Sequence, residues 1–326
     1  MNYKNRIRHI EKKIRDYDKL RSQSQLGTSL ENENIHELKL SDVKVKILLH
    51  YKSNNSSNTF LSYRNSYNNF IRLIGDKYIN QVNKSDLEDY KIKRSNEVNL
   101  VSTNIDIRNI KAIFNKMAEL DMIEYSKLSG VKQFKIETKK VLSIDTADIV
   151  NILNSTKDIQ MRQIIRFTLL TASRISEVLI IKMKDIDIDK GIINIYQQKT
   201  NCYKTIPLTN RLLELINEII QSDDQINTTS LKESYLFYNK FKNDPYSKLR
   251  ADTVSKNFKK ILRQLNLSND FKFHSLRHSA ITELIMNNVP LNVVKEIAGH
   301  KSISTTMGYS HVKSEDMRQA VNSLSY

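Results

Sequence analysis

Apolar side chains recur at helical spacing through the first half of the chain. A stripe between residues 59 and 74 lies on one face of an α-helix, and Gly75 is expected to end that helix. Ser85 and Glu88 have the spacing of a capping box, which predicts the start of a second helix. The first stripe comprises Phe60, Tyr63, Tyr67, Phe70, Ile71 and Ile74, and a third helix is predicted from Ile107, Ile110, Ile113, Phe114, Met117 and Leu120. Residues 41–132 are therefore predicted to form a small all-helical domain.

In the second half, part of the pattern changes from helical to alternating. Ile193 and Ile195 alternate with polar residues, and a second strand-like run covers residues 205–208. Asn201, in the intervening "KTNC", suits a left-handed turn position, so the two runs predict an antiparallel hairpin. The rest of residues 141–326 is mostly helical. The expected fold class is mainly α, with a helical domain followed by an α-rich domain that carries a small antiparallel β-sheet.

The segments outside these two domains are basic. Residues 1–40 are charged and then irregular, and we interpret them as a basic appendage of unknown role. Residues 133–140 lack periodicity, which is typical of a linker. Over its 326 residues the chain has 52 Lys and Arg against 36 Asp and Glu, a formal net charge of +16. Such an excess favours a polyanionic partner, nucleic acid above all.

Composition also limits where the protein is expected to act. The chain contains no apolar run long enough to span a bilayer, so no membrane partner is expected. Its opening residues are basic but lack the apolar region of a secretory signal. Cys202 is the one cysteine and cannot form an internal disulfide or a zinc site. A reducing, cytoplasmic setting is the expectation.

One carboxylate cluster, "DIDIDKG", superficially resembles a calcium loop. A calcium loop of the EF-hand type needs Gly at its sixth position and Glu at its twelfth, where this chain has Lys190 and Tyr196. The simpler interpretation is a short strand with solvated aspartates and with Ile186 and Ile188 pointing inward. No metal and no cofactor are therefore expected, and a two-metal phosphoryl-transfer mechanism has no obvious ligands.

A more informative stretch is "HSLRHSAITELI", residues 274–285. Its apolar positions predict a helix that begins near residue 275, with His274 and Arg277 in the first turn. Backbone N–H groups and the helix dipole favour a phosphate there, and the Arg277 guanidinium fits two phosphate oxygens. His278 is assigned an ordinary structural role.

Further candidates lie elsewhere in the sequence. Arg174 occupies a small and apolar segment, where a buried guanidinium needs a counter-charge or an anionic ligand, and Glu177 could orient it. Lys199, at the tip of the predicted hairpin, can reach a DNA groove or donate a proton. The candidate set for a metal-free phosphodiester transfer is Arg174, Lys199, His274, Arg277, His300 and Tyr309, with Glu177 in support.

The order of these residues resembles the tyrosine recombinase family, which includes phage integrases and Xer-like proteins. The motifs that carry the resemblance are Arg174, Lys199, "HSLR", "GH" and "TTMGYSH", and the likeness extends over residues 41–326. It implies that Tyr309 is the nucleophile and leaves a covalent 3′-phosphotyrosine. It also implies that Arg174 and Arg277 clamp the non-bridging phosphate oxygens.

The remaining roles follow from the same resemblance. Lys199 would be the general acid toward the leaving 5′ oxygen, His274 and His300 would assist proton transfer, and Glu177 would hold the first arginine. The chain departs from the family pattern in two places. "TAS" replaces the commoner "TGL" before that arginine, and "KTNC" lacks the usual Gly after Lys-Thr. The second departure leaves Lys204 as the alternative general acid.

The implied activity is site-specific DNA recombination through a Holliday junction, for integration and excision or for resolution, without metal or ATP. The helical domain would close a clamp on double-stranded DNA, and four copies would act as a tetramer on two paired sites. Accessory DNA-bending or directionality proteins are compatible partners, and the source would be bacterial or phage. The alternatives are DNA relaxation of the type IB topoisomerase kind and a non-catalytic DNA-binding protein of the same fold.

The end of the chain carries a further helical pattern. An apolar stripe predicts a terminal helix that docks onto a neighbouring copy, with docking into its own domain as the alternative. The stripe comprises Met317, Ala320, Val321 and Leu324.

Overall fold

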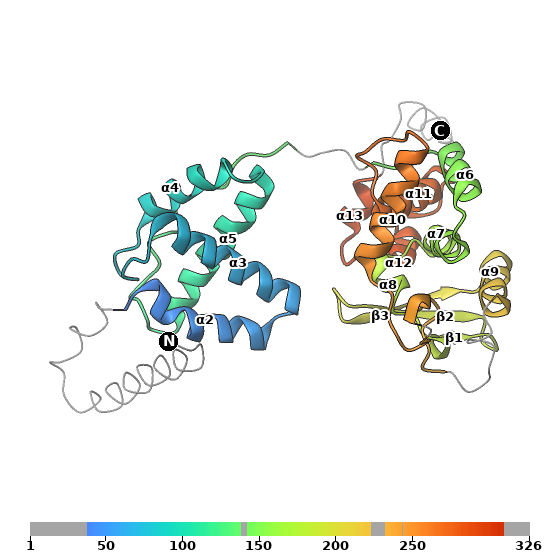
Figure 1. Cartoon of the computed structure of the whole chain (residues 1–326), viewed down its shortest axis with the longest axis horizontal. Helices are drawn as coiled ribbons and strands as arrows, with labels where there is room; N and C mark the ends of the chain where they lie inside the picture. The colour runs from blue at the N-terminus through green and yellow to red at the C-terminus, as the bar shows by residue number, and fades with distance from the viewer. Residues whose placement is uncertain (1–37, 138–141, 223–231, 243, 310–326) are drawn as a thin grey trace, which may run out of the picture. The chain divides into compact units, whose positions relative to one another are not determined.

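The computed structural model describes residues 38–137, 142–222, 232–242 and 244–309. The chain divides into two compact units, Met1–Thr138 and Lys139–Tyr326. Figure 1 shows the helices and strands of each unit. Each unit has its own hydrophobic core. The basic appendage up to residue 37 and the predicted docking helix after Tyr309 lie outside the described residues.

The described part of the first unit is helical. Its helices are α2 (Leu40–Asn54), α3 (Ser57–Ile74), α4 (Lys84–Ser95) and α5 (Leu100–Glu119). The predicted helix ending at Gly75 is confirmed as α3, whose C-cap glycine has a φ of 94°. The third predicted stripe is confirmed as the buried face of α5. Helix α2 is a fourth helix of this unit, and it was not among the three that were predicted individually.

The predicted cap of α4 is wrong by two residues. Asn83, not Ser85, is the N-cap, and its side chain accepts hydrogen bonds from the backbone N–H groups of Ser85 and Asp86. The carboxylate of Asp86 accepts a hydrogen bond from the Asn83 N–H in return. Asn and Asp satisfy the same reciprocal pattern as Ser and Glu, so the sequence offered two overlapping capping boxes and the earlier one is used.

The second unit surrounds a small sheet with helices. Its elements are α6 (Thr146–Ser155), α7 (Ile159–Thr171), α8 (Ile175–Val178), η2 (Met183–Asp185), β1 (Ile186–Asp187), β2 (Ile192–Gln197), β3 (Cys202–Pro207), α9 (Asn210–Gln221), η3 (Lys240–Lys242), α10 (Ala251–Gln264), α11 (Phe273–Met286), α12 (Leu291–Ala298) and α13 (Ile303–Met307). This content confirms the expected fold class.

The sheet is antiparallel, in the order β1-β2-β3. Ile193 and Ile195 of β2 are fully buried, and Asn201 has a φ of 54° in the turn to β3, so the predicted hairpin is confirmed. The interpretation of the aspartate-rich strand needs one correction. Strand β1 ends at Asp187, and the side chain of Ile188 is 56% exposed rather than inward. The chain turns there because Asp187 accepts a hydrogen bond from the Lys190 N–H.

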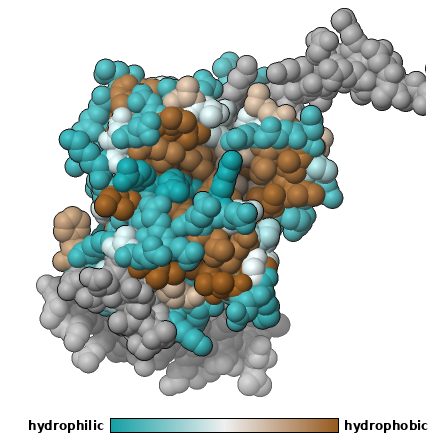
Figure 2. Space-filling model, turned by 90° about the vertical axis from the view of Figure 1, so that its right-hand side faces the viewer, coloured by the Kyte–Doolittle hydropathy of each residue, from teal (hydrophilic) through white to brown (hydrophobic). Residues whose placement is uncertain are grey.

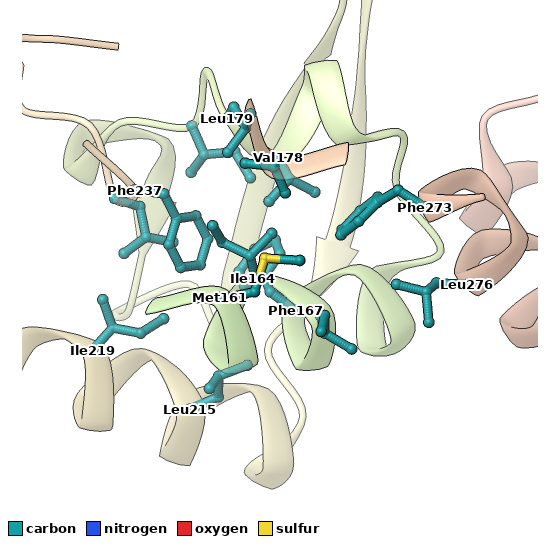
Figure 3. Close-up of a cluster of buried hydrophobic side chains, with 14 of the residues drawn as sticks. Met161, Ile164, Phe167, Val178, Leu179, Leu215, Ile219, Phe237, Phe273 and Leu276 are labelled. Carbon is teal, nitrogen blue, oxygen red and sulfur yellow. The ribbon is translucent and has the colours of Figure 1, made fainter. Parts of the chain in front are cut away.

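The core of this unit fixes the start of helix α11. Phe273 and Leu276 lie in the same buried cluster as Phe167 of α7 and Val178 of α8 (Figure 3). Helix α11 begins at Phe273, two residues earlier than expected, with Lys272 as its N-cap. His274 is therefore in the first turn, whereas Arg277 falls in the second turn and is buried.

The surface combines apolar and polar patches. Figure 2 shows separate groups of hydrophobic side chains on one face, divided by hydrophilic ones. Among the helices in the described ranges, none has the length and apolar character needed to cross a membrane.

Candidate active site

The first part of the site is the turn between α7 and α8. Ala172 ends α7 in the left-handed conformation, with a φ of 47°, and Arg174 is the N-cap of α8. Glu177 is buried, and its two carboxylate oxygens accept hydrogen bonds from Arg174, one from Nη1 at 2.6 Å and one from the backbone N–H at 3.0 Å. This pairing fixes the guanidinium of Arg174, which stays partly exposed.

Arg277 reaches the same turn from helix α11. Its side chain is only 1% exposed, and its Nη1 donates a hydrogen bond to the carbonyl oxygen of Ala172 at 2.8 Å. The same atom lies 4.0 Å from a carboxylate oxygen of Glu177. Burial, followed by the charge of Arg174, lowers the pKa of Arg277 to about 10, which leaves the guanidinium charged at neutral pH.

One nitrogen of Arg277 has no partner within the described ranges. Nη2 is buried and donates no hydrogen bond to any described residue. A buried donor on a charged group is costly when it is unsatisfied, so such a group marks the place of a missing acceptor. Two arginines with one carboxylate between them carry an excess positive charge, and an anion would supply the acceptor.

The structure separates the two candidate lysines. Lys199 lies on the exposed turn between β2 and β3, and within the described ranges no hydrogen bond or ion pair joins it to the other site residues. Lys204, on β3, is buried, and its Nζ donates hydrogen bonds to the carbonyl oxygens of Thr171 at 3.0 Å and Ile297 at 2.8 Å. Burial is the main cause that lowers the pKa of Lys204 to about 7. Lys204 is thus the lysine placed beside the arginines.

The two predicted histidines come from different elements. His274 is exposed in the first turn of α11. His300 follows α12 directly, is buried, and its Nδ1 lies 2.9 Å from Oγ1 of Thr306. Burial, followed by the charges of Arg277 and Arg174, lowers the pKa of His300 to about 4. A neutral ring at this position can donate or accept a hydrogen bond without adding charge.

Tyr309 lies just after α13 and packs against the small cluster formed by α11 and α12. Its ring is stacked with that of His300 at a centroid distance of 6.2 Å. Burial raises the pKa of Tyr309, while the charges of Arg277 and Arg174 act in the opposite direction. The phenol is therefore protonated at neutral pH, close enough to both arginines to sense their charge.

His278, which lies outside the predicted set, contacts the predicted nucleophile. Its Nδ1 forms a hydrogen bond with the hydroxyl of Tyr309, and its ring lies 4.5 Å from that of His274 between centroids. The assignment of His278 to an ordinary structural role is therefore incomplete. A signal was available, because His274 and His278 are four residues apart and so share one face of helix α11.

A glycine joins the hairpin to the loop of His300. Gly299 has a φ of 68°, and a Cβ atom there would lie 1.7 Å from Nε2 of Gln197. That Nε2 donates a hydrogen bond to the Gly299 carbonyl at 3.3 Å, and Oε1 of the same amide accepts one from Oγ1 of Thr200 at 3.1 Å. The end of β2, its turn and the segment before His300 are thus packed through one buried amide.

Comparisons with known proteins agree with this arrangement. The model of the phage integrase family matches residues 142–316, more than half of the chain. A probable integrase/recombinase protein of Methanocaldococcus jannaschii is 34% identical over 156 residues, which are 46% of this chain and 45% of that protein. The tyrosine recombinase XerD of Staphylococcus saprophyticus is 26% identical over 283 residues, 82% of this chain and 92% of that protein.

A solved structure extends the comparison to the fold. A lambda integrase tetramer bound to a Holliday junction superposes with a TM-score of 0.69 at 14% identity. The superposition covers 90% of this chain and 88% of that chain. Both units of the present chain therefore have a counterpart of the same fold.

Proposed function

Because the chain belongs to the phage integrase family and is a tyrosine-type site-specific recombinase, we propose that it cleaves and rejoins DNA strands through a covalent 3′-phosphotyrosyl intermediate. The observation that carries this proposal is the setting of Tyr309. Its hydroxyl lies in a cluster with two histidines and senses two arginines, and one of these has a buried Nη2 that finds no partner among the described residues.

The chemistry follows from the charges of the site. Arg174 and Arg277 would bind the non-bridging oxygens of one phosphodiester and stabilise the charge that develops on them. The oxygen of Tyr309 would attack phosphorus, the P–O5′ bond would break, and the 3′ end would stay attached to the enzyme. Because the phosphotyrosyl bond conserves the phosphodiester's free energy, a free 5′ hydroxyl can reverse the step without ATP.

The leaving oxygen needs a proton. We assign this general acid role to Lys199, which the exposed hairpin turn could carry toward DNA, with Lys204 as the alternative. His274 and His300 would hydrogen-bond the phosphate or relay protons, and Glu177 would keep Arg174 in place. The hydrogen bonds between Glu177 and Arg174 support the role of Glu177, and the contact of His300 with Thr306 holds the imidazole ring in place.

The larger assembly is part of the same proposal. The helical unit would bind duplex DNA together with the catalytic unit, which suits the net charge of +16. Recombination between two duplexes requires four active sites, so the proposed assembly is a tetramer that passes through a Holliday junction. The lambda integrase structure, a tetramer on such a junction, supports this choice through its shared fold. Element integration and excision, or resolution of joined DNA, would be the task, with accessory DNA-bending proteins as further partners.

The test is covalent trapping. Duplexes selected from a random library by binding to the full chain supply the substrate, and a nick near the cleavage site lets the freed fragment diffuse away. The wild-type protein and Tyr326→Phe should form an adduct that survives denaturing electrophoresis. Tyr309→Phe should bind the same DNA with unchanged affinity and form none, because only the hydroxyl is lost.

Two outcomes would contradict the proposal. An adduct of full yield in Tyr309→Phe would assign the chemistry to another tyrosine, and loss of the adduct in Tyr326→Phe would point to that residue. Holliday junctions formed from paired duplexes would distinguish recombination from relaxation by a topoisomerase-like reaction.

A further inference from the structure

The hydroxyl of Tyr309 has one hydrogen-bond partner in the described part of the chain, and it is a histidine outside the predicted set. Nδ1 of His278 contacts Oη of Tyr309, with the two ring centroids 5.4 Å apart. The two histidines that were predicted to assist proton transfer are placed differently. Nδ1 of His300 is engaged with Thr306, and the ring of His274 packs edge-on against His278.

The protonation states allow His278 to accept this hydrogen bond. Burial, followed by the charge of Arg277, lowers the pKa of His278 to about 4, so the ring is neutral at neutral pH. The phenol of Tyr309 is protonated in the same range, because burial raises its pKa. In the tautomer with the ring proton on Nε2, Nδ1 accepts the hydrogen bond that the hydroxyl donates, and this is the tautomer that a base requires.

We propose that His278 is a catalytic residue that takes the proton of Tyr309 as the phenol oxygen attacks phosphorus. This inference rests on the proposed function. In the forward step the Oη–P bond forms, the proton moves from Oη to Nδ1, the P–O5′ bond breaks, and the general-acid lysine protonates O5′. In the reverse step the imidazolium returns its proton to the departing phenol.

Electrostatics make His278 a better base in the DNA complex than in the free protein. Arg277 on the same helix is the main charge that opposes an imidazolium at position 278. A bound phosphodiester brings a negative charge to the arginine pair and offsets that repulsion. The base would thus gain its proton affinity when the substrate is in place.

The test separates proton transfer from simple positioning. In His278→Asn the amide oxygen can accept the hydrogen bond that Nδ1 accepts, but it cannot take up a proton. His278→Ala removes both functions. Single-turnover adduct formation should fall by roughly 10² to 10⁴-fold in both variants, as expected for loss of general base catalysis. Free imidazole should restore part of the rate in His278→Ala, and thermal unfolding and DNA affinity should match the wild type.

A second substrate tests whether a variant impairs the attack of the phenol or the departure of the 5′ oxygen. Sulfur in place of the bridging 5′ oxygen gives a leaving group that needs no proton. Of the variants Lys199→Met and Lys204→Met, the one that lacks the general acid should recover cleavage with this substrate. His278→Asn should stay slow.

Two results would be decisive against this role. A wild-type rate in His278→Asn would reduce His278 to a hydrogen-bond acceptor, and rescue of that variant by the bridging sulfur would place it on the leaving-group side. If His278→Asn fails to fold, His278→Gln serves as the second variant under the same criteria. Absence of an adduct in the wild type would instead overturn the proposed function, on which the inference rests.

Discussion

Lys204 is buried beside Arg174 and Arg277, with its amine on two backbone carbonyls. A neutral amine has two N–H donors, so it satisfies both carbonyls without adding a third positive charge to the site. Protonation adds an N–H donor and a charge, which a DNA phosphate nearby would favour. The residue therefore ties α7 to α12 in the free protein and can become a charged group when DNA binds.

This arrangement makes stability depend on pH. The pKa of Lys204 is about 7 in the folded state, below its ordinary value of 10.5. Between these two values the unfolded chain binds more protons than the folded chain, so the free energy of unfolding should rise with pH. The rise should approach roughly 1 kcal/mol per pH unit between pH 7 and 9.5. Denaturant unfolding across that range measures it, and Lys204→Met should lack the rise. An equal slope in the variant would contradict the low pKa.

Residue identity could be predicted from the sequence more fully than residue environment. The order of the motifs singled out the arginines, Glu177 and Tyr309, and the structure brings these together. The sequence carried a signal for the buried lysine, because Lys204 precedes Ile206 by two residues and so lies on the same buried face of β3, whereas Lys199 lies in the turn. The sequence could not show that His278 contacts Tyr309, since that contact joins two elements 31 residues apart.

At the scale of elements, the packing of Gly299 against Gln197 connects the hairpin to the loop of His300. Gly191 offers a matched comparison, because its φ of 63° is close to the 68° of Gly299 while a Cβ atom there would meet nothing within 4 Å. Alanine at either position should lower the free energy of unfolding by about 1–2 kcal/mol, because a residue with a Cβ atom is strained in the left-handed conformation. Only Gly299→Ala should also displace the buried amide of Gln197.

We therefore expect Gly299→Ala to lower the unfolding temperature more than Gly191→Ala. It should also slow adduct formation by more than about 10-fold, because a misplaced catalytic group reduces the rate steeply. Adding Gln197→Ala should recover part of the lost stability of Gly299→Ala, since the clash is removed. Thermal unfolding and single-turnover trapping of the four proteins check this, and equal behaviour of the two single glycine variants would refute it.

Periodicity predicted several elements, and local chemistry decided where those elements begin and end. The apolar stripes predicted α3 and α5, and the alternation of Ile193 and Ile195 predicted the hairpin. The start of α4 was missed because Asn83 and Asp86 cap it as well as Ser85 and Glu88 could. The start of α11 was missed because Phe273 is buried in the core, which extends the helix toward its N-terminus.

At the scale of the whole molecule, the chain consists of two units with separate cores and a large excess of positive charge. If both units contact the DNA backbone, roughly 6 to 10 phosphate contacts would form. Affinity should then fall about 10³ to 10⁵-fold between 50 and 200 mM salt. Titration of the full chain with a selected duplex measures the slope. The fragment of residues 139–326 should show a clearly smaller slope, and an equal slope would show that the helical unit makes no phosphate contacts.

The two cores also bear on how such a chain changes over generations. No buried cluster includes residues from both sides of the boundary at Thr138 and Lys139 among those described. Exchange of gene segments at that boundary would leave both interiors whole. A descendant could in this way inherit a different helical unit, and with it a different preference for DNA, while the cluster around Tyr309 passed on unaltered.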